Sequence, residues 1–442
     1  MQEQPGRTPT VSRVFDKGAM VELVYDAASA DTQLAYRRSD GIASLEHEIG
    51  LPSGEILIPY SPRNNLLTSG CVLLPSAIGE AADKADLLAG IKARISAYAD
   101  LSPLFMDIAA HYVLLSWVHD AFNELPYLRF QGEFGTGKTR ALLAIGSLCY
   151  KPIFASGAST VSPLFHLLHE FGGTLVLDEA DLRFSDATAD LTKILNNGTV
   201  KGMPVLRTMT NRHRELNPHA FTVFGPKLIA MREGFQDEAL ESRFLTENTS
   251  VTRMRDDIPI HLPDSMKSEA LDLRNRLLRW RFENRNHIAV DPARVIEGLS
   301  PRSNQTALAL LSLIDDPTLR VAIGAHLAMA EARGAARRAA LPHVAMVGVL
   351  HRRFEANITS YITLADAVAD YNALAIAGGE SLLTHKAAGH LIRARLGLVT
   401  TKTRGIYVVP AHEKKKVADL AQRYGVGRDE QADTANGRAA GS

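Results

Sequence analysis

The spacing of apolar residues in the first 80 residues differs from that in the rest of the chain. Short apolar runs at 19–25 and 54–59 alternate with Gly, Asp and Pro, which is typical of strands separated by turns. Residues 1–10 are polar, and we expect a loose end there. The pattern predicts a small β-rich N-terminal domain over 1–80, without a catalytic motif of its own.

Helical spacing starts near residue 81 and gives two segments, 82–98 and 102–122. In the second, Ser102 and Pro103 suit an N-cap and a first helical residue. These helices precede the apolar run at 126–131.

Two apolar runs, 126–131 and 173–177, predict buried strands, and a helix begins near residue 140 between them. A further helix is expected at 187–195 and a further strand at 221–231. The fold class is therefore α/β, with a parallel sheet between helices, over a core of 81–259.

The segment between the first strand and its helix reads Gly-Glu-Phe-Gly-Thr-Gly-Lys-Thr and fits the phosphate-loop pattern G-x-x-x-x-G-K-[ST]. Glycines allow backbone N–H groups to surround an anion, and the helix N-terminus adds partial positive charge. Lys138 is expected to reach the β- and γ-phosphates of ATP, and Thr139 to bind Mg²⁺. The predicted nucleotide-binding residues are Gly132, Glu133, Phe134, Gly135, Thr136, Gly137, Lys138, Thr139 and Arg140.

The second apolar run ends in two carboxylates, Asp178 and Glu179. In parallel sheets the carboxyl ends of strands face ligands, so Asp178 is predicted to complete the Mg²⁺ site with Thr139. Glu179 is predicted to be the general base that polarises the attacking water.

Two extended pieces within 199–218 carry basic residues and suggest a β-hairpin inserted before the next strand. Their cations could contact the phosphates of a nucleic-acid strand, or they could belong to a solvated loop. The candidate DNA-binding residues here are Lys201, Arg207, Arg212 and Arg214.

The order of these parts resembles an AAA+ ATPase: phosphate loop, acidic strand, further strand, then Ala-Leu-Glu-Ser-Arg-Phe at 239–244. That last stretch is similar to the arginine finger of minichromosome maintenance helicases, and 195–207 resembles ATPases linked to phage and plasmid primases. The resemblance covers about 101–314.

The resemblance implies that Arg243 reaches the γ-phosphate in a neighbouring subunit of a ring, and the expected ring is a hexamer. It also implies a helical lid over 260–339, where Arg302 would be a second arginine sensor. Arg232 stands where such proteins usually carry a polar sensor, often asparagine, and is the candidate for that role. The predicted catalytic set is Glu179, Arg243, Arg302 and Arg232.

A helix at 384–398 and a strand pair at 400–409 resemble a winged helix within 340–424. The alternative is a helical packing domain with a solvated basic face. Residues 425–442 are polar and rich in Gly and Ala, and we expect them to be disordered. The phosphate-facing residues would be Lys386, Arg393, Arg395, Lys402 and Arg404.

Composition limits where nucleic acid could bind and leaves the predicted fold class unchanged. The net charge of the 442 residues is +0, so contacts with nucleic acid must come from local basic patches. The two cysteines form neither a disulfide framework nor a metal cluster. No run approaches the ~20 apolar residues of a membrane span, so we predict a cytoplasmic protein without membrane contact.

The leading hypothesis is an ATP-driven, ring-forming DNA helicase or translocase that replicates a phage, plasmid or mobile element. A single DNA strand would occupy the central channel, and a primase or polymerase is a candidate partner. The alternative is an AAA+ regulatory switch or loader that remodels a protein partner. A transcriptional regulator ranks last, because no receiver or activator loop is evident.

Overall fold

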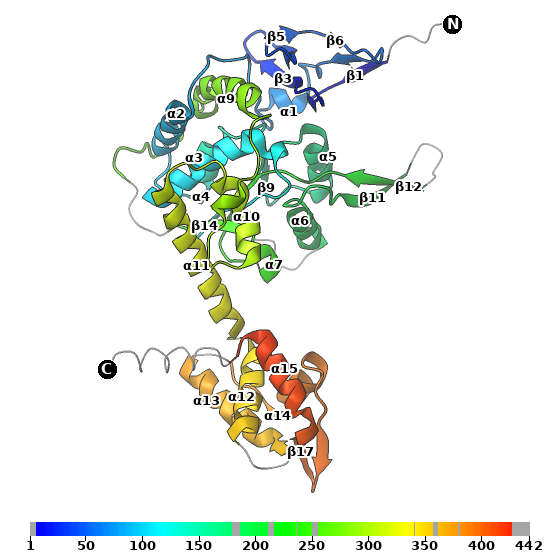
Figure 1. The fold of residues 1–442 in the computed structure, drawn as a ribbon, viewed down its shortest axis with the longest axis vertical. Coiled ribbons are helices and arrows are strands. Elements are labelled where there is room, and N and C mark those ends of the chain that lie inside the picture. The colour runs from blue at the N-terminus through cyan, green and yellow to red at the C-terminus, as the bar shows by residue number, and fades with distance from the viewer. Residues whose placement is uncertain are drawn as a thin grey trace. The chain divides into compact units, whose positions relative to one another are not determined.

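The computed structural model describes residues 6–178, 186–210, 216–235, 237–249, 255–339, 341–356, 361–378 and 381–426 (Figure 1). The predicted base Glu179, the hairpin-tip residues Arg212 and Arg214, and most of the predicted tail lie outside these residues. The chain forms two compact units, Met1–Ala328 and Met329–Ser442.

The N-terminal part of the first unit is made of two small sheets, as the strand pattern predicts. Residues 7–9, expected to be loose, form a strand because they pair in parallel with residues 56–58. One sheet has the order β1-β7-β6 and the other β2-β3-β4-β5. The strands are β1 (Arg7–Pro9), β2 (Ser12–Val14), β3 (Met20–Asp26), β4 (Asp31–Arg37), β5 (Ala43–Glu46), β6 (Ile49–Gly50) and β7 (Ile56–Ile58).

Three helices connect these sheets to the core: α1 (Asn65–Thr68), α2 (Lys84–Ser96) and α3 (Pro103–Val118), which ends in the 3₁₀ turn η1 (His119–Ala121). The side chains of Asp83 and Ser102 accept hydrogen bonds from backbone N–H groups in the first turns of α2 and α3. The predicted cap at Ser102 is therefore present, and α3 is buried along most of its length.

The core is a five-stranded sheet in the order β14-β8-β13-β10-β9, and every neighbouring pair in it is parallel. Residues 221–231, expected to be one strand, are divided, because β12 ends at Phe221 and β13 begins at Lys227. The strands are β8 (Tyr127–Gln131), β9 (Ile153–Ser156), β10 (Leu175–Asp178), β13 (Lys227–Met231) and β14 (Phe244–Asn248).

Alternate residues of each strand pack into separate cores on the two faces of this sheet. On β8, Leu128 and Phe130 join the core formed with α3 and α4 (Lys138–Gly146), whereas Tyr127 joins the other core. That second core includes α5 (Val161–Phe171) and α6 (Asp186–Asn197), which lie beside the sheet in Figure 1. The predicted sheet between helices is confirmed.

A β-hairpin projects from this core, as Figure 1 shows. Its strands, β11 (Val205–Thr210) and β12 (Leu216–Phe221), pair antiparallel, as the sequence predicts for the inserted segment. Leu206 and Leu216 are 70% and 76% exposed. They belong to the same face of the hairpin, because side chains alternate along each strand.

Helices predominate from residue 260 onward. The short helix α7 (Glu238–Glu241) precedes β14, and the helical segment after it contains α8 (Met266–Glu269), α9 (Leu271–Asn284), the 3₁₀ turn η2 (Pro292–Arg294), α10 (Pro301–Leu311) and α11 (Pro317–Ala339). The side chain of Ser300 caps α10 by accepting a hydrogen bond from the Ser303 backbone.

The second unit has its own core, built from α12, α13, α15 and a three-stranded antiparallel sheet of order β15-β17-β16. The helix expected at 384–398 is a short helix, α14, followed by one π-helical turn. The elements are α12 (Pro342–Ala356), β15 (Tyr361–Thr363), α13 (Leu364–Gly378), α14 (His385–His390), η3 (Leu391–Arg395), β16 (Thr401–Thr403), β17 (Ile406–Pro410), η4 (Ala411–Glu413) and α15 (Lys414–Tyr424).

A buried network of charges joins the N-terminal sheet to the core and to α9. The carboxylate of Glu22 on β3 pairs with Lys151 at 2.6 Å and with Arg281 at 2.8 Å, and each of these residues is 1% exposed. Arg281 also pairs with Asp120 at 2.8 Å, and Arg285 pairs with Asp120 at 3.1 Å. Burial alone would raise the pKa of Glu22, but the charges of Lys151 and Arg281 lower it.

No helix among the described residues combines the length and apolar content that crossing a bilayer requires.

Lys227 is fully buried at the start of β13, next to the base of the β11–β12 hairpin. Its Nζ donates to the backbone carbonyls of Val223 at 2.9 Å and Gly225 at 3.0 Å, on the chain that leaves the hairpin. It also lies 3.5 Å from the carbonyl of Gly198, on the chain that enters it. A Cβ at Gly198 would lie 2.2 Å from this nitrogen, so the close approach requires glycine there.

Burial lowers the pKa of Lys227 from 10.5 to about 7. Between these values the unfolded chain binds a proton that the folded chain lacks, so the free energy of unfolding should rise with pH by up to about 1.4 kcal/mol per unit. We expect Lys227→Met to remove this contribution, which urea unfolding at pH 7, 8 and 9 would measure. The exposed Lys201→Met is the control, and an equal pH dependence in both variants would contradict the assignment.

Candidate nucleotide-binding site

The predicted phosphate loop joins the carboxyl end of β8 to the first residue of α4, as its motif requires. Gly135 and Gly137 have φ of +75° and +83°, conformations that favour glycine. Gly137 directly precedes the first turn of α4, so the N–H groups of that turn lie at the end of the loop. The loop therefore has the backbone geometry of an anion site.

Gly132 is held against Thr249, which follows β14. A Cβ on Gly132 would lie 2.4 Å from both the backbone oxygen and the Oγ1 of Thr249. Thr249 donates its N–H to the Gln131 carbonyl at 2.7 Å, and its hydroxyl lies 2.7 Å from that of Thr136. Sequence reasoning missed Thr249, because no motif marks it and only the pairing of β14 with β8 brings it to the loop.

Lys138 and Thr139 mark the centre of the site. Lys138 Nζ donates to the loop carbonyls of Gly132 at 2.8 Å and Glu133 at 2.6 Å. The Thr139 hydroxyl donates to Asp178 Oδ2 at 2.7 Å, so two predicted Mg²⁺ ligands from separate elements are in contact. A hydroxyl and a carboxylate are hard oxygen donors, and with phosphate oxygens they fit the preference of Mg²⁺.

Arg232 directly follows β13, at the same edge of the sheet. Its guanidinium lies 3.5 Å from the ring centroid of Phe134, a loop residue whose side chain is 67% exposed. The structure thus brings the candidate sensor to the loop.

Arg140 is turned away from the loop in this structure. It donates to the carbonyls of Pro259 and Ile260, both at 2.6 Å, and so ties the first turn of α4 to the segment that precedes α8. Its predicted contact with a nucleotide stays a prediction.

Arg243 and Arg302 lie together at the opposite end of the sheet. Arg302 donates to the Ala239 carbonyl at 2.6 Å and to the Ser242 hydroxyl, next to Arg243. Arg243 itself donates to the side chain of Asn196. Burial, and secondarily the charge of Arg302, lower the pKa of Arg243.

Two basic residues of the hairpin region already have partners within the chain. Arg207 pairs with Asp190 at 2.7 Å and lies 4.3 Å from the ring centroid of Phe165 on α5. Lys201 is exposed and donates to the Asp120 carbonyl at 3.2 Å. Of these two, Lys201 is the more accessible to a ligand.

The basic residues predicted in the second unit fall on α14, η3 and the β16–β17 hairpin. Arg404 and Gly405 have φ of +48° and +87° and form the turn between the two strands. Lys402 lies 5.9 Å from the ring centroid of Tyr407, and Arg393 donates to Thr400 at 3.0 Å. Lys386 and Arg395 are exposed on α14 and η3.

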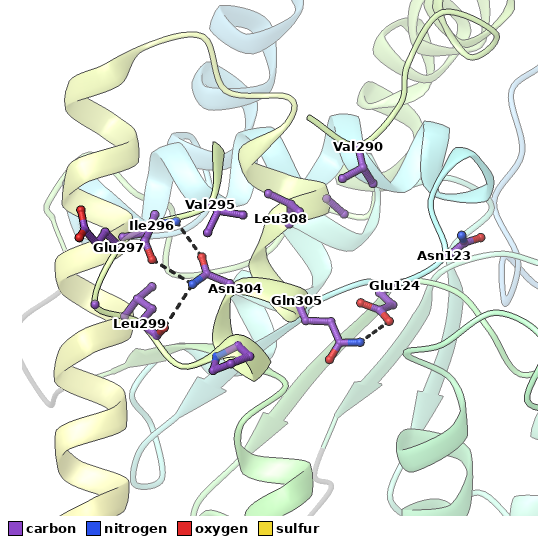
Figure 2. Close-up of a pocket in the computed structure, with 13 residues that line it drawn as sticks. Asn123, Glu124, Val290, Val295, Ile296, Glu297, Leu299, Asn304, Gln305 and Leu308 are labelled. Atoms are coloured by element: carbon purple, nitrogen blue, oxygen red, sulfur yellow. Dashed lines mark hydrogen bonds between the residues drawn. The ribbon is translucent and has the colours of Figure 1, made fainter. Parts of the chain in front are cut away.

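A separate hollow of about 720 Å³ lies along α10, next to Pro301 (Figure 2). Asn304 shapes it by donating to the Ile296 and Leu299 carbonyls, at 2.9 and 3.4 Å, while accepting from the Ile296 N–H at 2.8 Å. Apolar side chains make up much of its wall, and none of the predicted nucleotide-binding residues lines it.

No family model and no curated protein matches the chain. Among solved structures it is similar to the apo C-terminal region of NrS-1, with 11% identity and a TM-score of 0.38 over 88% of this chain and 96% of that one. It is also similar to the active helicase Cch of SCCmec type IV, with 11% identity and a TM-score of 0.37 over 93% and 95%. A third is the Aeropyrum pernix Orc1 protein in complex with DNA, with 16% identity and a TM-score of 0.21 over 73% and 94%.

The resemblance to helicases drawn from the sequence is repeated here, since an active helicase is among these similar structures.

The contact of Gly132 with Thr249 gives a direct test of the loop geometry. Gly132→Ala must displace Thr249 or the loop, and we expect it to weaken ATP binding and to cost about 1–3 kcal/mol of stability. Equilibrium nucleotide titration and urea unfolding would measure the two effects. Gly50→Ala is the control, because a Cβ there meets nothing within 4 Å; unchanged ATP affinity in Gly132→Ala would contradict the geometry.

Proposed function

We propose that the protein is an AAA+ ATPase that binds and hydrolyses Mg²⁺-ATP. The observation that carries the proposal is the contact between Thr139 at the start of α4 and Asp178 at the end of β10, beside the glycine loop and Lys138. Lys138 and the loop amides would hold the phosphates, and Thr139 with Asp178 would hold the metal. Mg²⁺ would neutralise phosphate charge, and Glu179 would orient the water.

Arg243 is proposed to act on the nucleotide of a neighbouring protomer. Phe244 pairs with Tyr127, whereas the phosphate loop follows Gln131 at the other end of β8. A strand rises about 3.3 Å per residue, so Arg243 lies roughly 15 Å from its own loop, beyond the reach of a side chain. Its position beside Arg302 supports a shared arginine face that completes the next site in a ring, for which we propose a hexamer.

We further propose that the ring is a DNA helicase or translocase. Two exposed elements support this function, because each could contact a DNA strand. They are the projecting β11–β12 hairpin and the basic hairpin of the second unit. The α14 helix followed by the β16–β17 hairpin supports a winged helix in the second unit. Residues 260–339 would be the helical lid, and a primase or polymerase would be a candidate partner.

Mixing two inactive variants tests the neighbouring-arginine proposal. Lys138→Ala should lose ATP binding, and Arg243→Ala should keep binding but lose about 10³–10⁵ in hydrolysis rate. In an equal mixture, roughly a quarter of the interfaces would pair an intact loop with an intact arginine, so steady-state ATPase assays should recover activity. Each variant mixed with itself is the control. Full activity of Arg243→Ala alone would exclude the role.

The DNA proposal predicts that single-stranded DNA stimulates ATP hydrolysis. Lys201→Ala combined with Arg207→Ala should abolish the stimulation, measured as turnover at increasing oligonucleotide concentration. Asp190→Ala removes the partner of Arg207 and keeps the cation, so it separates a DNA contact from the ion pair. Equal loss in Asp190→Ala would assign Arg207 to structure, and no stimulation of the wild-type protein would favour a loader of protein partners.

A further inference from the structure

The N-terminal domain contains a hollow that no predicted site includes. It has a volume of about 630 Å³ and lies between the β2–β3 turn, the end of β4 and the residues that follow α9. Its charged lining residues are Lys17, Arg37 and Arg285 against the single carboxylate of Asp16, with His287 beside them. The formal charge of the lining is thus positive, although the whole chain has a net charge of +0.

The β2–β3 turn, which lines the hollow, is held in a defined shape by contacts at Gly18. Gly18 has φ of +80°, and its carbonyl accepts from Arg37 Nη1 and from the Asn286 side chain, both at 2.9 Å. A Cβ on Gly18 would lie 2.8 Å from that amide nitrogen, and a φ of +80° strains any other residue, so the position favours glycine. Contacts from β4 and from the end of α9 therefore fix the hollow on both sides.

Lys17 and Arg37, two of the three cations of this hollow, form no ion pair with a carboxylate among the described residues. Lys17 is exposed, and the bond to the Gly18 carbonyl, a neutral acceptor, uses one of the five donors of Arg37. Arg285 pairs with Asp120, but the buried network to which it belongs holds three cations, Lys151, Arg281 and Arg285, and only two carboxylates. Positive charge is therefore in excess both on the wall and behind it.

Hydrogen bonds at the end of α9 weaken the negative partial charge that this helix end would present to an anion. Carbonyls at a helix C-terminus would repel an anion, but those of Arg281 and Asn284 already accept from the N–H groups of Arg285, His287 and Ile288.

We propose that this hollow binds phosphate groups of a nucleic-acid strand, and that it makes the N-terminal domain a second DNA contact of the proposed helicase. Arginine and lysine donors match phosphate oxygens, and a fork such as that of Arg37 binds them in a bidentate manner. The choice of a DNA strand as the source of the phosphate rests on the proposed function, whereas the anion site itself rests on the geometry of the hollow.

The test compares two double variants of the full-length chain that each remove two positive charges from the N-terminal sheets. Lys17→Gln with Arg37→Gln removes the two cations of the hollow that form no ion pair within the described part of the chain. Arg7→Gln with Arg38→Gln is the matched control, because both arginines lie outside the hollow and pair with Glu48 and Glu46. Fluorescence anisotropy with a labelled single-stranded oligonucleotide, repeated at several salt concentrations, measures affinity and its salt dependence.

We expect the hollow variant to lose on the order of tenfold in DNA affinity, and its plot of log K against log salt to flatten by about 0.7 for each lost phosphate contact. The control pair should keep both values, and DNA-free ATP turnover should be equal in the two variants. The salt slope distinguishes a lost contact from misfolding, because partial unfolding would lower the active fraction without removing a phosphate contact.

Equal affinity and salt slope in the two double variants would overturn the proposal while leaving the DNA function intact. Absence of DNA binding by a wild-type chain that hydrolyses ATP would overturn both the hollow's ligand and the helicase, but not the ATPase. Inorganic phosphate and ATP serve as competitors: displacement of DNA at micromolar concentration, lost in the hollow variant, would assign the site to a free phosphate compound instead.

Discussion

The parallel register of the five core strands is the constraint on which the rest of the structure depends. Because every neighbouring pair runs in the same direction, the carboxyl ends of β8, β13 and β10 meet at one edge and bring the glycine loop, Arg232 and Asp178 together. The same register sends Arg243, at the amino end of β14, to the opposite edge. One arrangement of backbone hydrogen bonds thus brings the residues of the proposed nucleotide site together and separates them from Arg243, which we propose acts in another copy.

Local chemistry explains why much of the core could be predicted from the sequence. The phosphate loop, the acidic strand end and the cap at Ser102 depend on residues that are neighbours in the chain, so the spacing alone indicates them. The order of the strands in the sheet could not be predicted in this way, and the position of Thr249 shows why. It contacts Gly132 through a strand pairing, and nothing near residue 249 in the sequence marks that contact.

Ion pairs between residues far apart in the chain could not be predicted from the sequence. Glu22 lies in a run of apolar residues that correctly predicts a buried strand, yet its partners Lys151 and Arg281 come from distant elements. Removing one member of such a network leaves an unpaired charge in the interior, which is far more costly than removing an exposed ion pair. Arg207 gives another case: its charge suggested a contact with phosphate or a place in a solvated loop, and the fold pairs it with Asp190 on α6.

The position of Lys227 has a structural consequence. This side chain fastens the entering and leaving segments of the β11–β12 hairpin to the first residue of β13, and the last residue of that strand adjoins Arg232, which is stacked on Phe134. The strand β13, hydrogen-bonded to β8 and β10 on its two sides, therefore runs from the base of the hairpin to the edge of the sheet that carries the phosphate-loop motif. The base of the β11–β12 hairpin and the residue that contacts the phosphate loop are thus joined through one strand of the sheet.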